Sequence, residues 1–347
     1  MFKRVLGWFL AIVIVLGIFG FAFLRGDIAA LMRMSVEDAG ENRVQNVIES
    51  FSSGNRIIVM PNSDTDELEH VLDRIYDEPA LFWVDMTYNA FSLGDVCIIA
   101  VREKYDNIEL IQNEIDVMSD GIIDSIIEDD MTEYDKVLAI HDWICENVDY
   151  GSCANNSDQD IYGALVLRKA LCAGYAESFT YLLNKVGIKS SVISGESINK
   201  EGESIAHAWN LVYIDNKPYY FDITWDDDKS GIIYDWFGIT SEEFKKSHFP
   251  SVGYDWVEAT SLEANYYYKN SMYIDSYHSS FIVQQINKQG KTFVIKCSDW
   301  LVMNKLLNSL GDRKEIQTIM KETGIQHINK IIYIENERVC CVHVEIQ

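Results

Sequence analysis

The chain has 347 residues, of which 29 are basic and 54 are acidic, so its formal net charge is −25. A chain this acidic repels phosphate backbones, which excludes nucleic acid as an expected partner. Hydrophobic residues make up 48% of the sequence, and the length allows two or three domains with cores of their own.

The first patterned segment is apolar. Lys3 and Arg4 precede VLGWFLAIVIVLGIFGFAFL, residues 5–24, which carries no charge. About 20 apolar residues span a bilayer as a helix, and the basic flank predicts a cytoplasmic N-terminus. We therefore expect a membrane anchor over residues 1–25 and an extracytoplasmic remainder at the cell membrane. A cleaved signal peptide, which would leave the protein secreted, is the alternative, because residues 20–22 include small side chains.

Residues 26–130 alternate between helical and strand-like patterns. Ser63 or Asp64 can cap a helix, and an apolar stripe at 3.6-residue spacing marks a longer helix over 108–126. Strands are expected at 56–60, at 81–84 (LFWV) and at 96–103 (VCIIAVRE). We predict a small N-terminal α/β region here.

Residues 131–258 carry the pattern of a larger core. Thr132 to Asp135 resembles a capping box, and a second helix starts near Cys172 and ends at Gly187. His141 falls on the polar side of the first helix, where we expect a structural role. Three strands follow, SSVISG at 190–195, HAWNLVYI at 207–214 and PYYFDITW at 218–225, and Asp215-Asn216-Lys217 is a hairpin signal between the last two.

Residues 259–347 predict a small C-terminal α/β domain without visible chemistry. The tyrosine-rich residues 262–284 suggest an extended connection, and a hairpin over 328–334 and 338–346 ends the chain. Ser298 or Asp299 can cap a helix in between.

Three residues of the core are arranged as a catalytic group requires. Cys172 lies where its helix begins, so free N–H groups and the helix dipole favour the thiolate. A thiolate needs a base, usually His, and the base needs an orienting acceptor. His207 lies on the strand expected at 207–214, and Asp222 lies on the following strand, at 218–225. This is the layout of papain-like cysteine catalysis.

The segments LCAGYAESFTYLL and HAWNLVYIDNKPYYFDITWDD resemble the core of the transglutaminase-like superfamily, including its bacterial and kyphoscoliosis-peptidase-type members. The resemblance extends over roughly residues 134–240, and EPALFWV and SLEANYYYKN are similar to segments of membrane-anchored or secreted Gram-positive proteins. It implies an α+β papain-like fold, in which a helix carrying the cysteine packs on an antiparallel sheet carrying His and Asp. It also implies Cys172 as nucleophile, His207 as general base and acid, and Asp222 as the group that holds the imidazole.

The expected strand register leaves one difficulty. If Ile214 pairs with Tyr219, then Asp222 lies opposite Leu211, on the same face as His207. The two side chains are then four positions apart, about 13 Å along the strand. Twist, a bulge or a different loop would have to close that gap.

The remaining candidates surround this group. The Cys172 N–H is the expected first oxyanion donor, and Tyr150 is the candidate for the second. Trp209 can line a substrate cleft or pack the sheet. Residues 226–228, three consecutive aspartates, can bind calcium or form a solvated loop. None of the seven cysteines forms a C-x-x-C pair, so we expect no metal and no cofactor, although Cys145 and Cys153 could form a disulfide.

Together these features predict an extracytoplasmic enzyme that transfers an acyl group through a thioester. Water as acceptor gives a peptidase or amidase, whereas an amine as acceptor gives a crosslinking transferase. The expected substrate is a protein or a cell-wall peptide, through its peptide or glutamine amide bonds. The alternative is a catalytically silent module that keeps the fold for binding or as a scaffold.

Overall fold

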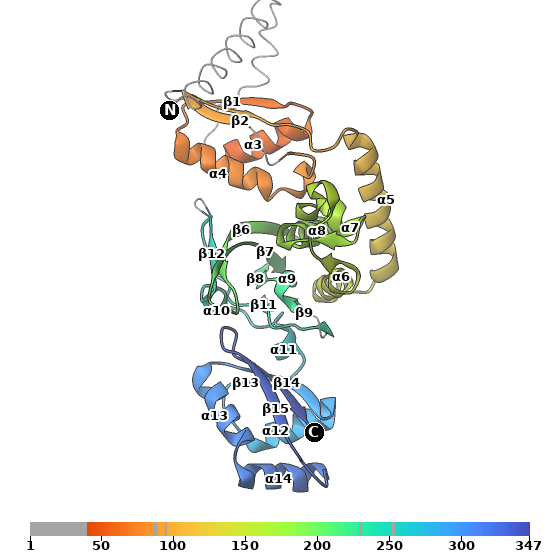
Figure 1. Cartoon of the computed structure of the whole chain (residues 1–347), viewed down its shortest axis with the longest axis vertical. Helices are drawn as coiled ribbons and strands as arrows, with labels where there is room; N and C mark the ends of the chain where they lie inside the picture. The colour runs from red at the N-terminus through yellow and green to blue at the C-terminus, as the bar shows by residue number, and fades with distance from the viewer. Residues whose placement is uncertain (1–39, 86–88, 94–95, 229–230, 252–253) are drawn as a thin grey trace, which may run out of the picture. The chain divides into compact units, whose positions relative to one another are not determined.

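The computed structural model describes residues 40–85, 89–93, 96–228, 231–251 and 254–347 (Figure 1). The predicted anchor at residues 1–25 lies outside these ranges. Among the residues that are described, no helix combines the length and apolar character needed to span a bilayer. The chain forms two compact units, residues 1–112 and 113–347, which are described one at a time.

In its described residues, the first unit combines a three-stranded antiparallel sheet with helices. Its elements are α3 (Gly40–Ser52), β1 (Ile57–Pro61), α4 (Thr65–Tyr76), η1 (Pro79–Leu81), β2 (Asn89–Leu93) and β3 (Val96–Ala100), with strand order β1-β3-β2. The Asp64 side chain caps α4 by accepting the Glu67 N–H, as predicted. The strand predicted over 81–84 is wrong, because Glu78 caps a 3₁₀ turn that Pro79 begins.

The second unit begins within α5 (Ile108–Ile126) and contains a five-stranded antiparallel sheet of order β11-β8-β7-β6-β12. The strands of this sheet are β6 (Ser190–Ile198), β7 (Ser204–Ile214), β8 (Lys217–Phe221), β11 (Phe237–Ile239) and β12 (His248–Pro250). The helices around it are α6 (Glu133–Asn147), α7 (Ile161–Leu165), α8 (Cys172–Lys185), α9 (Ile223–Asp226) and α10 (Ser241–Phe244). Short pieces join them: β4 (Asp149–Tyr150), η2 (Ala154–Gln159), β5 (Lys169–Ala170), β9 (Asp227–Asp228) and β10 (Gly231–Ile232).

Helix α8 packs against β6 and β7, and α6 packs against α8 (Figure 1). The buried amide of Asn210 in β7 donates to the Ala176 carbonyl and to the Thr180 hydroxyl of α8, at 2.8 and 3.0 Å. The predicted capping box of α6 is present at Thr132 and Asp135. This is the predicted α+β arrangement, with the helix that carries the cysteine on an antiparallel sheet.

The β7–β8 hairpin is tighter than the sequence suggested. Ile214 pairs with Lys217, so the predicted pairing of Ile214 with Tyr219 is wrong. Asp215 and Asn216 both have positive φ, 50° and 61°, as a two-residue type I′ turn requires. Continuing the observed register brings Asp222 level with residue 209, two positions from His207 instead of four. The turn itself therefore removes half of the expected gap.

The C-terminal part of the second unit has a mixed four-stranded sheet, β13-β14-β16-β15, with helices beside it (Figure 1). Its elements are α11 (Tyr266–Lys269), β13 (Tyr273–Ile274), α12 (Ser279–Gln289), β14 (Thr292–Cys297), α13 (Trp300–Leu310), α14 (Arg313–Thr323), β15 (Ile331–Asn336) and β16 (Cys341–Ile346). Asp299 caps α13, and the terminal hairpin forms as predicted. The extended connection predicted over 262–284 is wrong, because α11, β13 and the start of α12 lie there.

Buried polar contacts connect this C-terminal part with the five-stranded sheet. Asp235 accepts from Tyr267, Asn336 and His343, each at 2.9 Å. The Lys296 ammonium lies 2.7 Å from both the Glu243 carboxylate of α10 and the Val339 carbonyl. Val339 and Cys341 also belong to the same hydrophobic cluster as Trp209 and Phe244. Buried polar contacts and one hydrophobic cluster therefore join the two sheets, while the C-terminal sheet also has a hydrophobic cluster of its own.

Candidate active site

Cys172 is the first residue of α8, and its side chain is partly exposed. The N-cap residue Leu171 provides no side-chain acceptor, so no cap competes for the N–H groups of the first turn. A Cβ on Gly174 would lie 2.9 Å from the Asp158 carbonyl and 2.8 Å from the Ala170 side chain, so glycine lets this turn pack closely. The thiol thus lies at the N-terminus of α8, beside the free N–H groups of its first turn.

His207 extends from β7, opposite Gly195 of β6. A Cβ at Gly195 would meet the Phe249 carbonyl at 2.2 Å, so this glycine allows β12 to approach the sheet. The imidazole stacks on the Trp225 indole, with ring centroids 5.1 Å apart at 25°. Its Nε2 lies 2.7 Å from Asp222 Oδ2, and the Cys172 thiol is close enough to act electrostatically on the ring. The structure therefore brings together the three residues that the sequence singled out.

Asp222 is the N-cap residue of α9 and is fully buried. Its Oδ1 accepts the Trp225 N–H at 3.1 Å, which fixes the carboxylate against the turn. Its Oδ2 faces His207. A single turn of helix therefore determines the direction of the carboxylate.

Opposite electrostatic effects act on this pair. Burial alone would lower the pKa of His207, but the Asp222 carboxylate and the Cys172 thiol raise it to about 10. Burial alone would raise the pKa of Asp222, but His207 and His248 lower it to about 2. Near neutral pH the imidazole is therefore protonated and the carboxylate ionised, a state that stabilises a neighbouring thiolate.

A second histidine, His248, contacts the same carboxylate and was missed by the sequence analysis. It begins β12, where it pairs with Ser197 of β6, and it is fully buried. Its Nε2 lies 3.1 Å from Asp222 Oδ2, and its Nδ1 lies 3.0 Å from the Ser247 hydroxyl. Burial lowers its pKa to about 4, with the charge of His207 acting in the same direction. No sequence motif surrounds this residue that could have revealed it.

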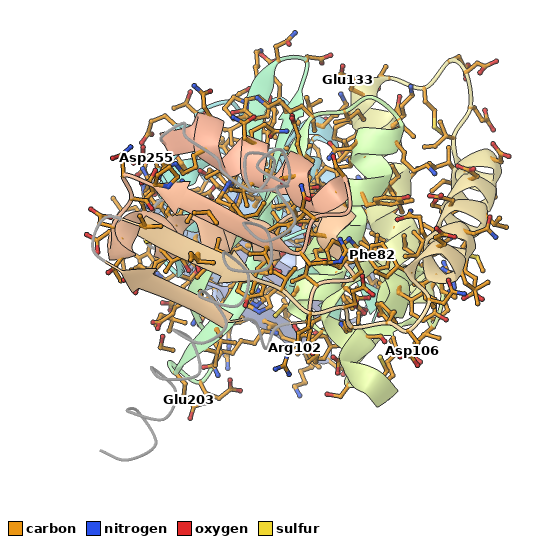
Figure 2. The ribbon with its side chains drawn as sticks, turned by 90° about the horizontal axis from the view of Figure 1, so that it is seen from above. Phe82, Arg102, Asp106, Glu133, Glu203 and Asp255 are labelled. Carbon is orange, nitrogen blue, oxygen red and sulfur yellow. The ribbon has the colours of Figure 1, made fainter. Side chains whose placement is uncertain are left out.

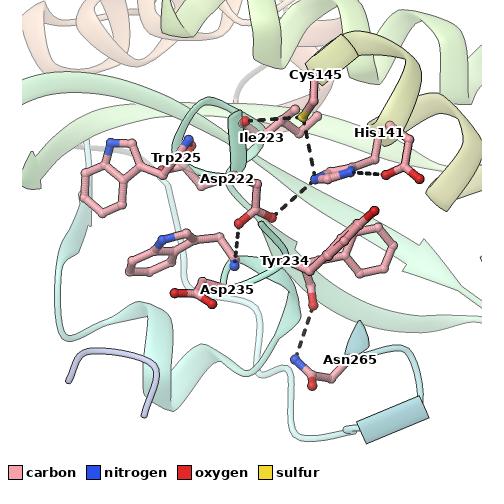
Figure 3. Close-up of polar contacts among 12 residues, drawn as sticks. His141, Cys145, Asp222, Ile223, Trp225, Tyr234, Asp235 and Asn265 are labelled. Atoms are coloured by element: carbon pink, nitrogen blue, oxygen red, sulfur yellow. Dashed lines mark hydrogen bonds and ion pairs between the residues drawn. The ribbon is translucent and has the colours of Figure 1, made fainter. Parts of the chain in front are cut away.

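A separate buried network holds the other end of α9 (Figure 3). Asp226 accepts the Trp236 N–H at 2.9 Å and lies 3.3 Å from His141 Nε2, while Asp142 lies 3.0 Å from His141 Nδ1. Cys145 lies beside the same ring, with its Sγ 4.0 Å from Nε2. Burial raises the pKa of Asp226 to about 7. The network links α6 to the turn that carries Asp222.

The structure corrects three expectations in this region. His141 is fully buried and does not lie on a polar face, because α9 and the rings of Tyr234 and Phe237 cover it. The acidic run is not a solvated loop, since Asp226 is buried and Asp227 accepts the Tyr175 hydroxyl at 2.6 Å. The suggested disulfide does not form, because both of its cysteines, 145 and 153, carry free thiols.

The two further candidates differ in exposure. Tyr150 in β4 is 58% exposed, and its pKa is raised by partial burial and by the charges of Cys172 and Asp222. It therefore remains a protonated phenol beside the thiol at neutral pH. Trp209 is fully buried against Phe244 and His248, in the packed wall behind His207. Tyr150 is therefore accessible to solvent and Trp209 is not.

The donor atoms of His207, Asp222 and His248 lie within 4.8 Å of one another, a spacing that could hold a metal ion. Both histidine nitrogens, however, lie at hydrogen-bonding distance, 2.7 and 3.1 Å, from the same carboxylate oxygen. Four aromatic rings (Trp209, Trp225, Trp236 and Phe244) surround His248 and leave it no water-facing side. We therefore interpret His207, Asp222 and His248 as a hydrogen-bonded group in which both histidines bond to the Asp222 carboxylate.

Residues 120–223 match the model of the transglutaminase-like superfamily. This segment is similar to the transglutaminase-like core. The matched segment includes Cys172, His207 and Asp222, whereas His248 lies beyond it. The core thus coincides with the helix and strands that bring the three residues together.

Two curated proteins are similar to this chain. Human kyphoscoliosis peptidase is 22% identical over 233 residues, 58% of this chain and 35% of the human protein. The mouse kyphoscoliosis peptidase is 24% identical over 172 residues, 44% of this chain and 26% of the mouse protein. The chain thus spans only about a third of the human relative's length.

Solved structures overlap with the chain in part. A candidate cysteine protease of Cytophaga hutchinsonii is 17% identical, with a TM-score of 0.28 over 43% of this chain and 65% of its own. A TGase is 18% identical, with a TM-score of 0.27 over 55% of this chain and 58% of its own.

Proposed function

We propose that this protein is a cysteine-dependent acyl-transfer enzyme of the transglutaminase-like type. Cys172 is the nucleophile, His207 the general acid and base, and Asp222 the residue that orients the imidazole. The observation that carries the proposal is the His207 ring, whose Nε2 lies 2.7 Å from Asp222 Oδ2 and which is close enough to the Cys172 thiol for the two groups to interact electrostatically. The name of the human relative, a peptidase, supports the same class of chemistry.

The first half of the reaction forms a thioester. The Cys172 thiolate attacks the carbonyl carbon of a carboxamide, so that a C–S bond forms and the carbonyl oxygen becomes an oxyanion. The His207 imidazolium gives its proton to the amide nitrogen, the C–N bond breaks, and the amine departs. In the second half, His207 takes a proton from water or from an acceptor amine, which attacks the thioester and releases the thiolate. Water yields a carboxylic acid, and an amine yields a new amide.

The oxyanion requires donors placed before the reaction. We propose the Cys172 backbone N–H as the first donor, because it opens α8. The Tyr150 hydroxyl is the proposed second donor, since its raised pKa keeps the proton on oxygen. Trp209 has no such role, because it is fully buried.

The proposed substrate is a protein or cell-wall peptide reached outside the cytoplasm. Acidic side chains, including Glu133, Glu203 and Asp255, project from the surface of the second unit (Figure 2). They favour cationic partners over anionic ones. Residues 5–24 would hold the enzyme at the membrane, as in anchored Gram-positive surface proteins. Membrane fractionation of the full chain, with residues 5–24 deleted as the control, tests this location.

Site-resolved alkylation tests the catalytic proposal. We expect iodoacetamide to modify Cys172 at pH 6 at least about tenfold faster than Cys153, because Cys172, unlike Cys153, lies beside an imidazolium. Cys153 is a matched control, since it is also partly exposed in the same chain. The His207→Ala variant should lose this advantage. Equal rates at the two cysteines in the unmodified protein would instead favour a silent scaffold.

A second assay separates the two acceptors. A fluorescent primary amine incorporated into a glutamine-containing protein would identify a transferase. Release of ammonia or of a new peptide terminus without incorporation would identify a hydrolase. Both activities should disappear in Cys172→Ala.

A further inference from the structure

His248 is held in one orientation by its surroundings. It is fully buried, and its ring stacks on Phe244 with centroids 3.8 Å apart at 27°. Two hydrogen bonds use both ring nitrogens, Nδ1 with the Ser247 hydroxyl and Nε2 with Asp222 Oδ2. The ring therefore cannot turn away from the carboxylate without leaving a buried polar group unpaired.

The proton on His248 can be assigned from its partners. An ionised carboxylate only accepts hydrogen bonds, so Nε2 carries the proton and donates to Asp222. Nδ1 then accepts from the Ser247 hydroxyl. In the described part of the chain, Asp222 and His207 are the titratable groups that act on this ring, and the positive charge of His207 opposes a second one on His248. His248 is therefore a neutral donor.

His248 and His207 bond to the same oxygen of Asp222, so His248 affects how the carboxylate holds His207. Asp222 Oδ2 receives His207 at 2.7 Å and His248 at 3.1 Å, while Oδ1 is held by the Trp225 N–H. The carboxylate is thus fixed at three points, and His248 is the one side chain among them that is not itself proposed to react. If it were removed, the carboxylate would lose a donor on the oxygen that orients His207.

We propose that His248 is a positioning residue that holds the Asp222 carboxylate ionised and directed at His207, and so maintains the Cys172 thiolate. This inference rests on the proposed function, because it assumes that the His207 imidazolium activates Cys172. It adds a fourth member to the group and places it outside the segment that matches the superfamily model. A residue that only filled space would be replaced equally well by phenylalanine, since four aromatic rings surround it.

The test compares two replacements in the full chain. His248→Phe fills the aromatic cage but removes the donor, whereas His248→Gln keeps an N–H near the position of Nε2. We expect His248→Phe to slow iodoacetamide labelling of Cys172 at pH 6 by about 10- to 100-fold, the usual effect of a lost hydrogen bond to a charged group. His248→Gln should stay within about threefold of the unmodified protein, since the donor remains.

His343→Phe is the control, because it also removes a histidine bonded to a buried carboxylate, Asp235, but leaves Asp222 untouched. It should label Cys172 normally. Normal labelling in His248→Phe would overturn the positioning role and leave the proposed function intact. An equal decrease of the Cys172 labelling rate in His248→Phe and His343→Phe would overturn the positioning role as well. So would an equal decrease in His248→Phe and His248→Gln. Slow labelling of Cys172 already in the unmodified protein would instead refute the proposed function itself.

Discussion

Asp222 combines full burial with three donors on its two oxygens. An ionised carboxylate taken out of water is stabilised only if its lone pairs are used, and here Trp225, His207 and His248 use them. Because the three donors share one acceptor, a substitution of one changes the strength of the others. We therefore expect non-additive effects among these residues, both on stability and on the reactivity of Cys172.

The lowered pKa of His248 predicts a loss of stability in mild acid. Its pKa falls from 6.5 to about 4 on folding. As the pH drops below about 6.5, the unfolded chain therefore binds a proton that the folded chain does not bind until about pH 4. Between these values the folded state should lose up to about 3 kcal/mol from this residue alone. Urea unfolding at a series of pH values measures the effect.

His248→Phe should not show this loss, so its unfolding free energy relative to that of the unmodified protein should rise as the pH falls from 6.5 to 4. The difference between the two proteins is the readout, because Asp226, whose pKa burial raises to about 7, acts with the opposite sign in both of them. Asp222 does not confuse this window, because its pKa is lowered from 3.8 to about 2 and its contribution is lost only as the pH falls through that lower range. His343→Phe is the control. The pKa of His343 is raised on folding, so the stability that this residue contributes is lost as the pH rises, not as it falls. Identical curves for His248→Phe and the unmodified protein would contradict the prediction.

Among the elements, α9 has the largest role for its length. It is a single turn, yet Asp222 at its start meets the two histidines of the site and Asp226 at its end meets His141 of α6. So short a helix has little stability of its own. Its conformation therefore depends on these two buried carboxylates, and a change at Asp226 should be felt at Asp222.

Asp226→Ala tests this dependence. The change leaves the Trp236 N–H and a nitrogen of His141 buried without an acceptor, which should cost about 2–4 kcal/mol of stability. The displaced turn should also slow Cys172 labelling at pH 6. Asp228→Ala is the matched control from the same acidic run, because Asp228 is only partly buried, and its effect should stay within about 0.5 kcal/mol. Urea unfolding and site-resolved alkylation provide the two readouts, and an undiminished labelling rate would contradict the coupling.

The sequence correctly predicted helix ends that are determined by residues close to them in the chain. The caps at Asp64, Thr132 and Asp299, and the helix that begins at Cys172, follow from residues within one turn of each end. The order of cysteine, histidine and aspartate along helix and strands was also sufficient to select the residues that the structure brings together.

Two features that the sequence did not predict, the roles of His248 and His141, depend on contacts between segments far apart in the chain. His248 lies 26 residues beyond Asp222, in a three-residue edge strand with no periodicity to detect. His141 was expected at the surface because its own helix gives no sign that α9 covers it. The hairpin register failed for a different reason: a loop of two residues and one of four fit the same polar signal, and only the left-handed backbone of Asp215 and Asn216 separates them.

At the scale of the molecule, the C-terminal part is joined to the five-stranded sheet by buried polar contacts and by a hydrophobic cluster. Asp235 loses its three side-chain donors if residues beyond 258 are absent, and Glu243 loses the Lys296 ammonium. Val339 and Cys341 would also leave the hydrophobic cluster that backs Trp209. Removing one partner of a buried ion pair is strongly destabilising, about 3–5 kcal/mol.

We therefore predict that a chain of residues 106–347 folds cooperatively and that residues 106–258 alone do not. Circular dichroism during thermal unfolding distinguishes the two, with a single sigmoidal transition expected only for the longer chain. The point substitution Lys296→Met, which removes the charge but keeps the apolar stem, should lower the midpoint without abolishing the transition. A cooperative transition in the shorter chain would show that the core is independent of the C-terminal part.

The two-residue turn between β7 and β8 also makes the site sensitive to insertions and deletions. Adding or deleting one residue there would exchange the two faces of β8, so that the residue after it would leave the sheet on the wrong side. Among related chains, the length of this one loop would then distinguish those able to present a carboxylate to the histidine from those that keep only the architecture, even where all three side chains are still present.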